Sequence, residues 1–397
     1  MSQNAGILEK EEAMKIEKKL WITLFAFGLF AICFSGWIFS QSTTREKLFW
    51  DNTILCEAKE LAEGEIKSEN IALPEDFDIP RSILFKTTHT IAEVWLDGEK
   101  IYEYGNEADA PGFMKTPGSC WHIVDIPGDS AGKNLEVRIV PVYEGYYGNE
   151  VSLVYGTRGD CILKILTDSL GTLVISCGIL FAAVICLLLY FGAVRRKRRD
   201  KTEAKIEIFL NLGFFSLLVA VWTLVQCGFL QFWIPDGRTL YFVDYFSLFL
   251  FPVPFNFLLY DICKSRYHKG ALIFSTLYLA NMAVDVFLQC TGIIDMSRLL
   301  SATHVIMVAN AVYTVVIILY EARKEGNDVA QKFQYPMYAV MGFGMAEMIL
   351  YYLRKFQQTS ILLSTGTMLF IIMLIWIQVS QYYDQYIQKQ KVIYLQK

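Results

Sequence analysis

Eight long apolar runs constrain this chain more than any other feature of its sequence. A helix needs about 20 predominantly apolar residues to cross a bilayer. Residues 20–40 form the first run, and a long gap follows it. Seven more runs come in close succession, at about residues 170–194, 206–229, 240–263, 271–292, 299–320, 333–353 and 361–380. The pattern predicts a membrane anchor, an inserted domain over residues 41–169, and a bundle of seven transmembrane helices over residues 170–380.

The composition supports a membrane protein and excludes several function classes. Only 19% of the 397 residues are charged, whereas soluble domains average about 25%. The net charge is −4, so we expect no nucleic-acid partner. The sequence contains no phosphate-binding loop, no GxSxG or HExxH motif and no CxxC pair. We therefore expect no catalytic site, no metal and no cofactor.

Lysine and arginine in the short loops predict the orientation, because cytoplasmic loops are enriched in these residues. The strongest cluster is RRKRR at residues 195–199, directly after the second span. The loops after the fourth and sixth spans are also basic, and the alternate loops are poorer. Residues 1–19 and 381–397 are therefore expected in the cytoplasm, and residues 41–169 outside the cell membrane. A headgroup or nucleic-acid site is the alternative role of the cluster.

The external segment has the alternating pattern of β-strands. In FKTTHTIAEVWLDGEKIYEYG (85–105), apolar and polar residues alternate about Asp97-Gly98, a pair that suits a type I′ turn. The alternation places Ala92, Val94, Leu96 and Ile101 on one face and Glu93, Trp95, Tyr102 and Tyr104 on the other. GDSAGKN (128–134) predicts a second hairpin, between CWHIVDIP and LEVRIVPVY. With ILF (83–85) and EVSLVYG (150–156), these strands predict an all-β sandwich.

Aromatic side chains in this domain are the candidate ligand-binding residues, because sugars stack on such rings between a few polar groups. The candidates are Trp95, Tyr102, Tyr104, Trp121, Tyr146 and the two histidines His89 and His122. The alternative is that these side chains pack in the core or against the bundle. Three external cysteines, Cys56, Cys120 and Cys161, allow one disulfide, and their spacing does not choose the pair.

Within the apolar runs, three ionisable residues are candidate functional groups: Asp285, His304 and Glu347. A charge inside the bilayer is costly and usually faces the interior of a bundle. A transporter would use such groups to couple ions. FPVPFN (251–256) is expected to kink the fourth span, because two prolines remove backbone donors.

The C-terminal segment extends the last span with a seven-residue repeat. Ile372, Val379, Tyr386 and Ile393 recur at this spacing, and Ile375 and Tyr382 occupy a second position. The pattern predicts a parallel helix pair, and therefore a homodimer. The alternative is an ordinary helix end.

The order of these parts resembles that of a bacterial family, the seven-transmembrane receptors with diverse intracellular signalling modules. The most specific residues are FKTTHTIAEVWLDGEKIYEYG (85–105) and GSCWHIVDIPGDSAGKNLEVRIVPVYEGYYG (118–148). Lys86 stands where that family has arginine more often. The resemblance implies an external jelly-roll domain, similar to carbohydrate-binding domains of glycosidases. It also implies a cytoplasmic output, often a diguanylate cyclase with a GGDEF motif.

These residues contain no GGDEF motif. Either the chain is the sensory part of a longer receptor, or it signals through a partner. The leading hypothesis is a membrane receptor for an external, glycan-like ligand. The alternatives are a transporter with an external substrate-binding domain and a structural protein that holds an external partner.

Overall fold

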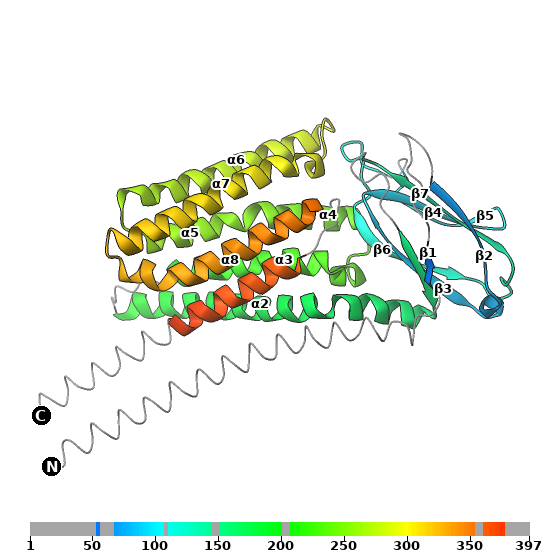
Figure 1. The fold of residues 1–397 in the computed structure, drawn as a ribbon, viewed down its shortest axis with the longest axis horizontal. Helices are drawn as coiled ribbons and strands as arrows, with labels where there is room; N and C mark the ends of the chain where they lie inside the picture. The colour runs from blue at the N-terminus through cyan, green and yellow to red at the C-terminus, as the bar shows by residue number, and fades with distance from the viewer. Residues whose placement is uncertain are drawn as a thin grey trace, which may run out of the picture. The chain divides into compact units, whose positions relative to one another are not determined.

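The computed structural model describes residues 53–55, 67–106, 110–143, 151–200, 207–353 and 360–377. The predicted anchor at 20–40, Cys56, Tyr146 and the repeat positions Val379, Tyr382, Tyr386 and Ile393 lie outside these ranges. The described residues form a β-sandwich of two antiparallel sheets followed by a set of long helices (Figure 1).

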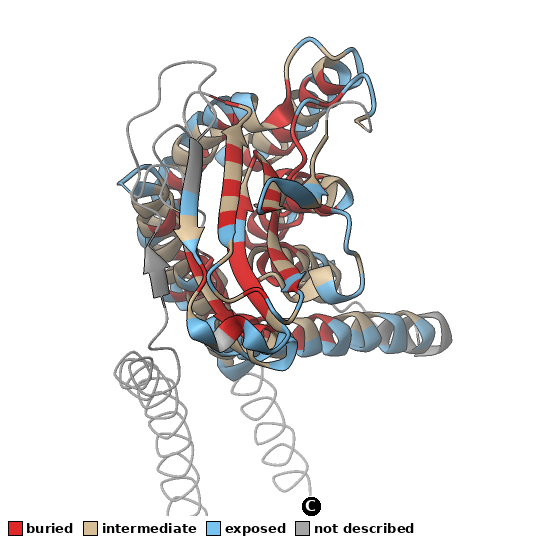
Figure 2. Ribbon diagram, turned by 90° about the vertical axis from the view of Figure 1, so that its right-hand side faces the viewer, coloured by how far each residue is buried: buried red, intermediate tan, exposed pale blue. Residues whose placement is uncertain are grey.

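Each sheet of the sandwich has four strands within the described ranges. The first sheet has the order β1 (Thr53–Leu55), β8 (Ser152–Gly156), β3 (Arg81–Thr88) and β6 (Ser119–Ile126). The second has the order β2 (Lys67–Ala72), β7 (Asn134–Pro141), β4 (Thr90–Leu96) and β5 (Glu99–Tyr104). Buried and half-buried positions alternate along β4 and β6. Figure 2 shows such bands of buried and intermediate colour on strands of the sandwich. The core therefore lies between the two sheets, where Phe85, Val94 and Val137 pack together.

The β4–β5 hairpin is confirmed, but a bulge changes its register. Asp97 and Gly98 have φ values of 49° and 83°, as a type I′ turn requires. Trp95 pairs with Lys100, whereas Val94 pairs with Tyr102, so the register shifts by one residue. A bulge adds a residue to one strand and redirects the side chains that follow. The predicted face was therefore wrong for Tyr102 and Tyr104, which pair with buried Val94 and Ala92.

The predicted hairpin at residues 128–134 was wrong. β6 pairs with β3 in one sheet, and β7 pairs with β2 and β4 in the other. The loop therefore crosses between the sheets. Its backbone N–H groups at Ser130 and Gly132 donate to the carbonyls of Phe77 and Leu73, 3.0 Å away in each case. Both partners lie before β3 in the chain. The turn residues therefore stabilise a connection between the two sheets and do not form a hairpin within one sheet.

The first long helix, α2 (Arg158–Asp200), starts directly after β8. Thr157 Oγ1 accepts from the Asp160 N–H at 3.2 Å, and Asp160 Oδ2 accepts from the Thr157 N–H at 2.9 Å. This reciprocal pair is a capping box, which stabilises a helix start. Cys161 and Ile165 then pack on Leu84, on the outer face of the first sheet. The helix thus begins inside the predicted external segment, twelve residues before the expected span at 170.

The remaining helices complete the bundle. They are α3 (Glu207–Gln226), α4 (Gly237–Leu250), α5 (Pro252–Ile262), α6 (Lys269–Cys290), α7 (Met296–Arg323), α8 (Asp328–Leu353) and a shorter apolar helix, Ile361–Ile377. Short 3-10 helices η1 (Glu75–Asp78), η4 (Phe229–Phe232) and η5 (Arg266–His268) lie in the connections. The predicted kink in the fourth span is present, since the helix divides at Phe251, directly before Pro252.

Five helical segments are long and apolar enough to cross a membrane. They correspond to α2, α3, the α4–α5 pair, α6 with η5, and α7. The predicted count of seven is not reached, because α8 and Ile361–Ile377 do not qualify among the described residues. Large apolar side chains are exposed on the helices, for example Phe181 at 68%, Ile273 at 68% and Val305 at 70%. Such surfaces are stable in a bilayer and not in water, so the chain is a multi-pass membrane protein.

Candidate functional site: the junction between sandwich and bundle

The structure separates the predicted ligand-binding residues into three groups. The first group, His122 and Tyr102, belongs to the sandwich core. His122 is 1% exposed and stacks on Phe85 with ring centroids 4.8 Å apart. Its Nδ1 lies 2.9 Å from Tyr102 Oη, and its Nε2 lies 2.7 Å from Thr87 Oγ1. Burial lowers the His122 pKa to about 3. This histidine is therefore neutral and fully engaged inside the domain.

Trp95 forms the second group and remains on the outer face of the second sheet. The Arg138 guanidinium lies 4.4 Å from the centroid of its ring, and Lys100 Nζ lies 5.3 Å from it. The indole N–H donates to Glu93 Oε2 at 3.0 Å. Two salt bridges, Lys100 with Glu93 and Arg138 with Glu136, hold this array together. Trp95 is the one predicted candidate among the described residues that sits on an outward face away from the bundle.

Tyr104, Trp121 and His89 form the third group, which lies at the junction of the sandwich with the bundle. Tyr104 Oη donates to the Pro117 carbonyl at 2.8 Å and accepts from the Gly237 N–H, at the start of α4, at 3.2 Å. The Trp121 backbone N–H donates to Gln231 Oε1 at 2.8 Å. Gln231 Nε2 donates in return to the Trp121 carbonyl at 2.5 Å. These rings join two regions of the molecule.

His89 connects the β3–β4 turn to α4. Its φ of 52° is rare for a residue other than glycine. Backbone hydrogen bonds from His89 to Gly118 and from Val142 to His89 hold this conformation, at 2.9 and 3.0 Å. The His89 ring lies edge-on to Tyr241 of α4, with centroids 5.8 Å apart. Burial lowers its pKa to about 3, so it packs as a neutral ring.

Glycines allow the two regions to approach closely. A Cβ on Gly118 would lie 2.2 Å from the Gly237 carbonyl oxygen, and one on Gly237 would lie 2.2 Å from Tyr104 Oη. A Cβ on Gly228 would lie 2.8 Å from the Trp121 ring. Such distances do not occur between non-bonded atoms, so only glycine fits at these positions. The sandwich is therefore packed on the bundle, backbone against backbone.

A buried polar network crosses the junction. Tyr143, at the end of the sandwich, donates to the carboxylate of Asp295, the residue before α7. Gln289 Nε2, on α6, donates to Asp295 Oδ1 at 2.8 Å and to the Phe113 carbonyl at 2.6 Å. Gln289 Oε1 accepts from Tyr241 Oη of α4 at 3.1 Å. One network thus joins two sandwich loops to the ends of three helices.

The network members are almost completely buried. Gln289 is 0% exposed, and Tyr143 is 8% exposed. Burial raises the pKa of Tyr143 far above its usual range, with the Asp295 hydrogen bond as the second cause. The phenol therefore remains a donor to the carboxylate. Buried networks of this kind are sensitive to geometry, because any lost partner leaves a desolvated polar group.

Sequence reasoning missed this network. Gln289 is a single amide near the end of an apolar run, and Asp295 lies in a short loop. A buried amide in a span was a usable signal, because polar side chains in apolar helices need partners. The partners themselves, Phe113 and Tyr143, lie far away in the sequence and carried no signal.

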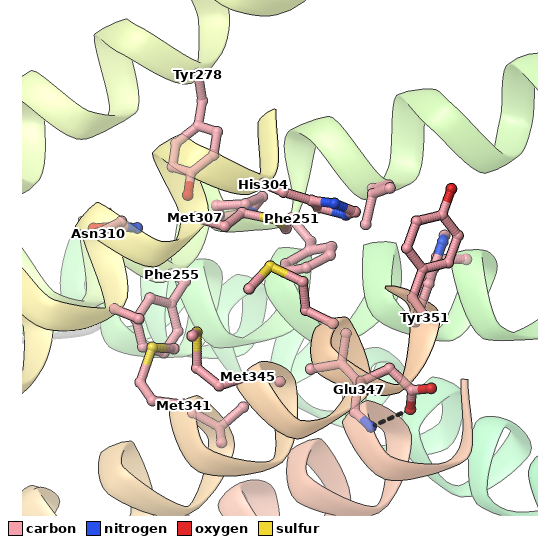
Figure 3. A pocket seen from close by; sticks show the side chains of 18 of the residues that line it. Phe251, Phe255, Tyr278, His304, Met307, Asn310, Met341, Met345, Glu347 and Tyr351 are labelled. Carbon is pink, nitrogen blue, oxygen red and sulfur yellow. Dashed lines mark hydrogen bonds between the residues drawn. The ribbon is translucent and has the colours of Figure 1, made fainter. Parts of the chain in front are cut away.

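The three intramembrane candidates do not form one site. Asp285 accepts from Asn281 Nδ2 at 2.8 Å, and that amide also contacts Thr303 Oγ1 of α7 at 2.9 Å. His304 and Glu347 instead line one pocket inside the bundle (Figure 3). Glu347 Oε2 accepts from the backbone N–H groups of Leu362 and Leu363, at 2.7 and 3.1 Å. It therefore caps the start of the Ile361–Ile377 helix.

Neither a metal site nor a disulfide was found in the described ranges. No group of three or more His, Cys, Asp or Glu side chains gathers there in a way that could hold a metal ion. Cys120 and Cys161 are both buried free thiols. Burial raises the Cys120 pKa to about 12, which favours the protonated thiol.

Comparisons with family models, curated proteins and solved structures found no match to this chain. The resemblance to seven-transmembrane receptors therefore remains a prediction from sequence. The functional argument rests on the geometry of the junction and of the bundle.

Proposed function

We propose that this protein is a membrane receptor in which the external β-sandwich senses a ligand and passes the change to the helical bundle. The observation that carries the proposal is the buried network of Tyr143, Gln289, Asp295 and Tyr241. It makes the sandwich loops part of the packing at the ends of α4, α6 and α7. A domain that only held a partner protein would need no such connection.

Transmission requires two arrangements whose balance the ligand changes. A small shift of the sandwich loop at Phe113 or Tyr143 removes a partner from Gln289 or Asp295. Each loss leaves a buried polar group without its hydrogen bond, at a cost of about 1–3 kcal/mol. Energies of that size move a two-state equilibrium by about 5- to 150-fold. The helices then re-pack to a second arrangement that satisfies these groups.

The long helix α2 offers a second route across the membrane. Its 43 residues extend about 65 Å at 1.5 Å per residue, roughly twice the thickness of the bilayer core. The Arg158 guanidinium binds Asp125 of β6 at 2.6 Å, and Cys161 packs under β3. The other end reaches the RRKRR cluster at 195–199. Movement of the first sheet would therefore displace the helix as a rigid body.

The ligand class follows from the resemblance to carbohydrate-binding jelly-roll domains. Trp95, with its charged neighbours Arg138, Lys100 and Glu93, is the aromatic platform that stays on an outward face. The positive-inside pattern predicts that this domain lies outside the cell membrane. The C-terminal segment would then carry the signal, as a homodimer, to a cytoplasmic output such as a diguanylate cyclase.

The test uses the purified full chain in lipid nanodiscs. A glycan array identifies a bound sugar, and hydrogen exchange is then measured at residues 237–245 and 289–300 with and without that sugar. We expect the sugar to change exchange at both helix ends in the wild-type chain. In Tyr143→Phe, which keeps the ring and removes the donor to Asp295, the sugar should still bind and the change should be lost.

Trp95→Ala is the matched control for binding. It should weaken sugar binding by about 1–3 kcal/mol, the usual cost of truncating an aromatic contact residue, without altering exchange in the absence of sugar. A sugar that binds the wild-type chain and leaves exchange at both helix ends unchanged would refute transmission through the junction. An array without any bound glycan would refute the ligand class.

A transporter is the second candidate, favoured by the pocket that His304 and Glu347 line within the bundle. It predicts uptake of a substrate into proteoliposomes that is lost in Glu347→Gln. The receptor predicts no uptake.

A further inference from the structure

Lys86 extends from the face of the first sheet that is turned toward the helices. On the same face of β3, Leu84 packs on Cys161 and Ile165 of α2. Trp121 pairs with Lys86 across the β3–β6 ladder, and its ring lies against Gly228, between α3 and η4. β6 also contacts α4, and Figure 1 shows it on the side of the sandwich next to the helix ends. The Lys86 side chain is therefore located between the sandwich and the bundle.

The surroundings of Lys86 are unusual for a lysine on a sheet. Its side chain is exposed to solvent. Nevertheless, burial by the surrounding protein lowers the pKa of its amine. A lysine on an open surface keeps its amine in bulk water, and its pKa then stays near the ordinary value. The two observations agree if the amine projects into a solvent-filled space that protein surrounds on most sides.

This amine has no counter-ion within the described residues, where Lys86 forms no hydrogen bond and no ion pair. Its close electrostatic contact is with the Trp121 ring, whose centroid lies 5.7 Å from Nζ. The Asp244 carboxylate on α4 attracts the amine without forming an ion pair, and Asp244 Oδ1 accepts from Gln226 Nε2 at 2.7 Å. Lys100 of β5, in contrast, bonds to two glutamates at 3.1 and 3.0 Å. The donors of Lys86 therefore remain available to a ligand.

The charges and the ring beside the amine select one class of ligand. Lys86 attracts a negative charge, and the Asp244 carboxylate on the other side repels a second one, so a single charge is favoured. A carboxylate carries one charge and accepts strong hydrogen bonds from an ammonium group. The Trp121 ring adds an apolar surface next to the amine, which an inorganic ion would leave unused. Ligand sites commonly combine an aromatic wall with a few polar groups in this way.

We propose that the space between the first sheet and the bundle binds a small organic monocarboxylate. Its carboxylate pairs with Lys86 Nζ, and its apolar body lies against Trp121. Because Trp121 is joined to Gln231 by two hydrogen bonds, at 2.8 and 2.5 Å, the ligand contacts the part of the sheet that is attached to the bundle. Trp95, the proposed sugar platform, lies on the other sheet. The carboxylate site is therefore independent of the proposed sugar binding.

Binding of 4-fluorobenzoate to the purified full chain in phosphatidylcholine nanodiscs tests this assignment, by broadening of the ¹⁹F NMR signal. The control probe, 4-fluorobenzamide, has the same shape and no charge. We expect saturable binding of 4-fluorobenzoate, and affinity for the amide lower by about tenfold, the loss of one hydrogen bond between charged groups. Equal affinities for the two probes, or no saturable binding of 4-fluorobenzoate, would overturn the proposal.

Competition with sodium formate examines the role of Trp121, because formate has the carboxylate and no apolar body. Formate should displace 4-fluorobenzoate only at a much higher concentration. Displacement at equal concentrations would show that the ring adds nothing, and the site would then be one for any small anion.

Two lysines provide a matched pair of variants. Lys86→Met removes the amine and should weaken 4-fluorobenzoate binding by about tenfold, without weakening binding of the amide. Lys86→Arg keeps the charge and should retain binding. Lys133→Met removes a lysine from the loop at 128–134 and should change nothing. Equal weakening in Lys86→Met and Lys133→Met would mean that the probe only follows the net charge of the domain.

A measurement on the wild-type chain keeps the result decisive if Lys86→Met fails to fold. The lowered pKa leaves more of the Lys86 amine unprotonated, so this lysine should react faster with trinitrobenzenesulfonate than Lys133 does. Peptide mass spectrometry then measures modification of each lysine. 4-Fluorobenzoate should protect Lys86 and not Lys133, and 4-fluorobenzamide should protect neither. Absence of protection at Lys86 would refute the carboxylate site.

Discussion

The β-sandwich and the helical bundle treat buried polar side chains differently. In the sandwich, Thr87 and Tyr102 both bond to His122, so that a polar cluster is closed within the core. In the bundle, Asn310 and Thr314 lie one turn apart on α7, and each has a buried oxygen without a partner in the described part of the chain. On α5, the side-chain oxygen and nitrogen of Asn256 are also buried without a hydrogen-bond partner in that part of the chain.

The difference concerns how firmly buried polar groups fix each region. A satisfied polar cluster favours one arrangement, because any movement breaks its hydrogen bonds. Buried polar groups without a hydrogen bond are destabilising, and a different packing of the helices can satisfy them. The hydrogen bonds of His122 therefore hold the sandwich core in one arrangement, and the bundle lacks that restraint at Asn310 and Thr314. The junction network connects the two.

Acid should destabilise the sandwich first, and this is the largest effect we expect. His89 and His122 have folded-state pKa values of about 3, and unfolded histidine has a pKa of about 6.5. Between these values the unfolded chain binds more protons than the folded chain, so stability falls as the pH is lowered through that window. Each histidine contributes at most about 1.4 kcal/mol per pH unit there.

The measurement is hydrogen exchange of the β3, β4 and β6 amides at pH 7.5 and pH 5.5, after correction for intrinsic rates. The stabilisation should be complete above about pH 6.5. His122→Gln should reduce the pH dependence of the sandwich. A dependence unchanged in that variant would contradict the neutral, buried state of the ring.

The close approach at the junction predicts a difference between two glycines of equal backbone conformation. Gly118 and Gly98 have φ values of 85° and 83°. A Cβ on Gly118 meets the Gly237 carbonyl at 2.2 Å, and one on Gly98 meets nothing within 4 Å. Gly118→Ala should therefore lose about 1–3 kcal/mol more than Gly98→Ala, the usual cost of an added methyl in a packed site.

This loss should fall on the contact between the regions. Protease susceptibility of the sandwich loops in nanodiscs should rise in Gly118→Ala and stay low in Gly98→Ala. Equal behaviour of the two variants would mean that the backbones do not press on each other in solution.

The smallest effects come from two isosteric substitutions that compare the regions directly. Thr87→Val removes a hydroxyl that His122 needs, whereas Thr314→Val removes one without a partner. We expect a cost of about 1 kcal/mol for the first and no cost, or a slight gain, for the second. Thermal unfolding of the two purified variants measures both. A clear destabilisation by Thr314→Val would show that its hydroxyl is bonded after all.

Much of the local structure could be predicted from the sequence. The Asp97-Gly98 turn, β3, β4 and the break at Pro252 follow from alternation, positive-φ turn residues and missing backbone donors, which act over a few neighbouring positions. The apolar runs predicted a membrane protein, because the length and hydrophobicity of a span can also be read from consecutive residues. The resemblance to receptors and the repeat beyond Ile375 remain predictions.

Only the tertiary structure decided how distant segments meet. One inserted residue at the β4–β5 bulge turned Tyr102 and Tyr104 to the core face, and the loop at 128–134 crossed between sheets instead of closing a hairpin. Trp121 and Tyr104 were predicted to bind a ligand, and they pack against the bundle because Gly228 and Gly237 leave room for their rings. Gln289 and Asp295 acquired their role from Phe113 and Tyr143, more than 150 positions away. Local patterns determine strands, turns and spans, because their energies depend on adjacent residues. Register, docking and the pairing of buried polar groups depend on contacts that exist only once the whole chain has folded.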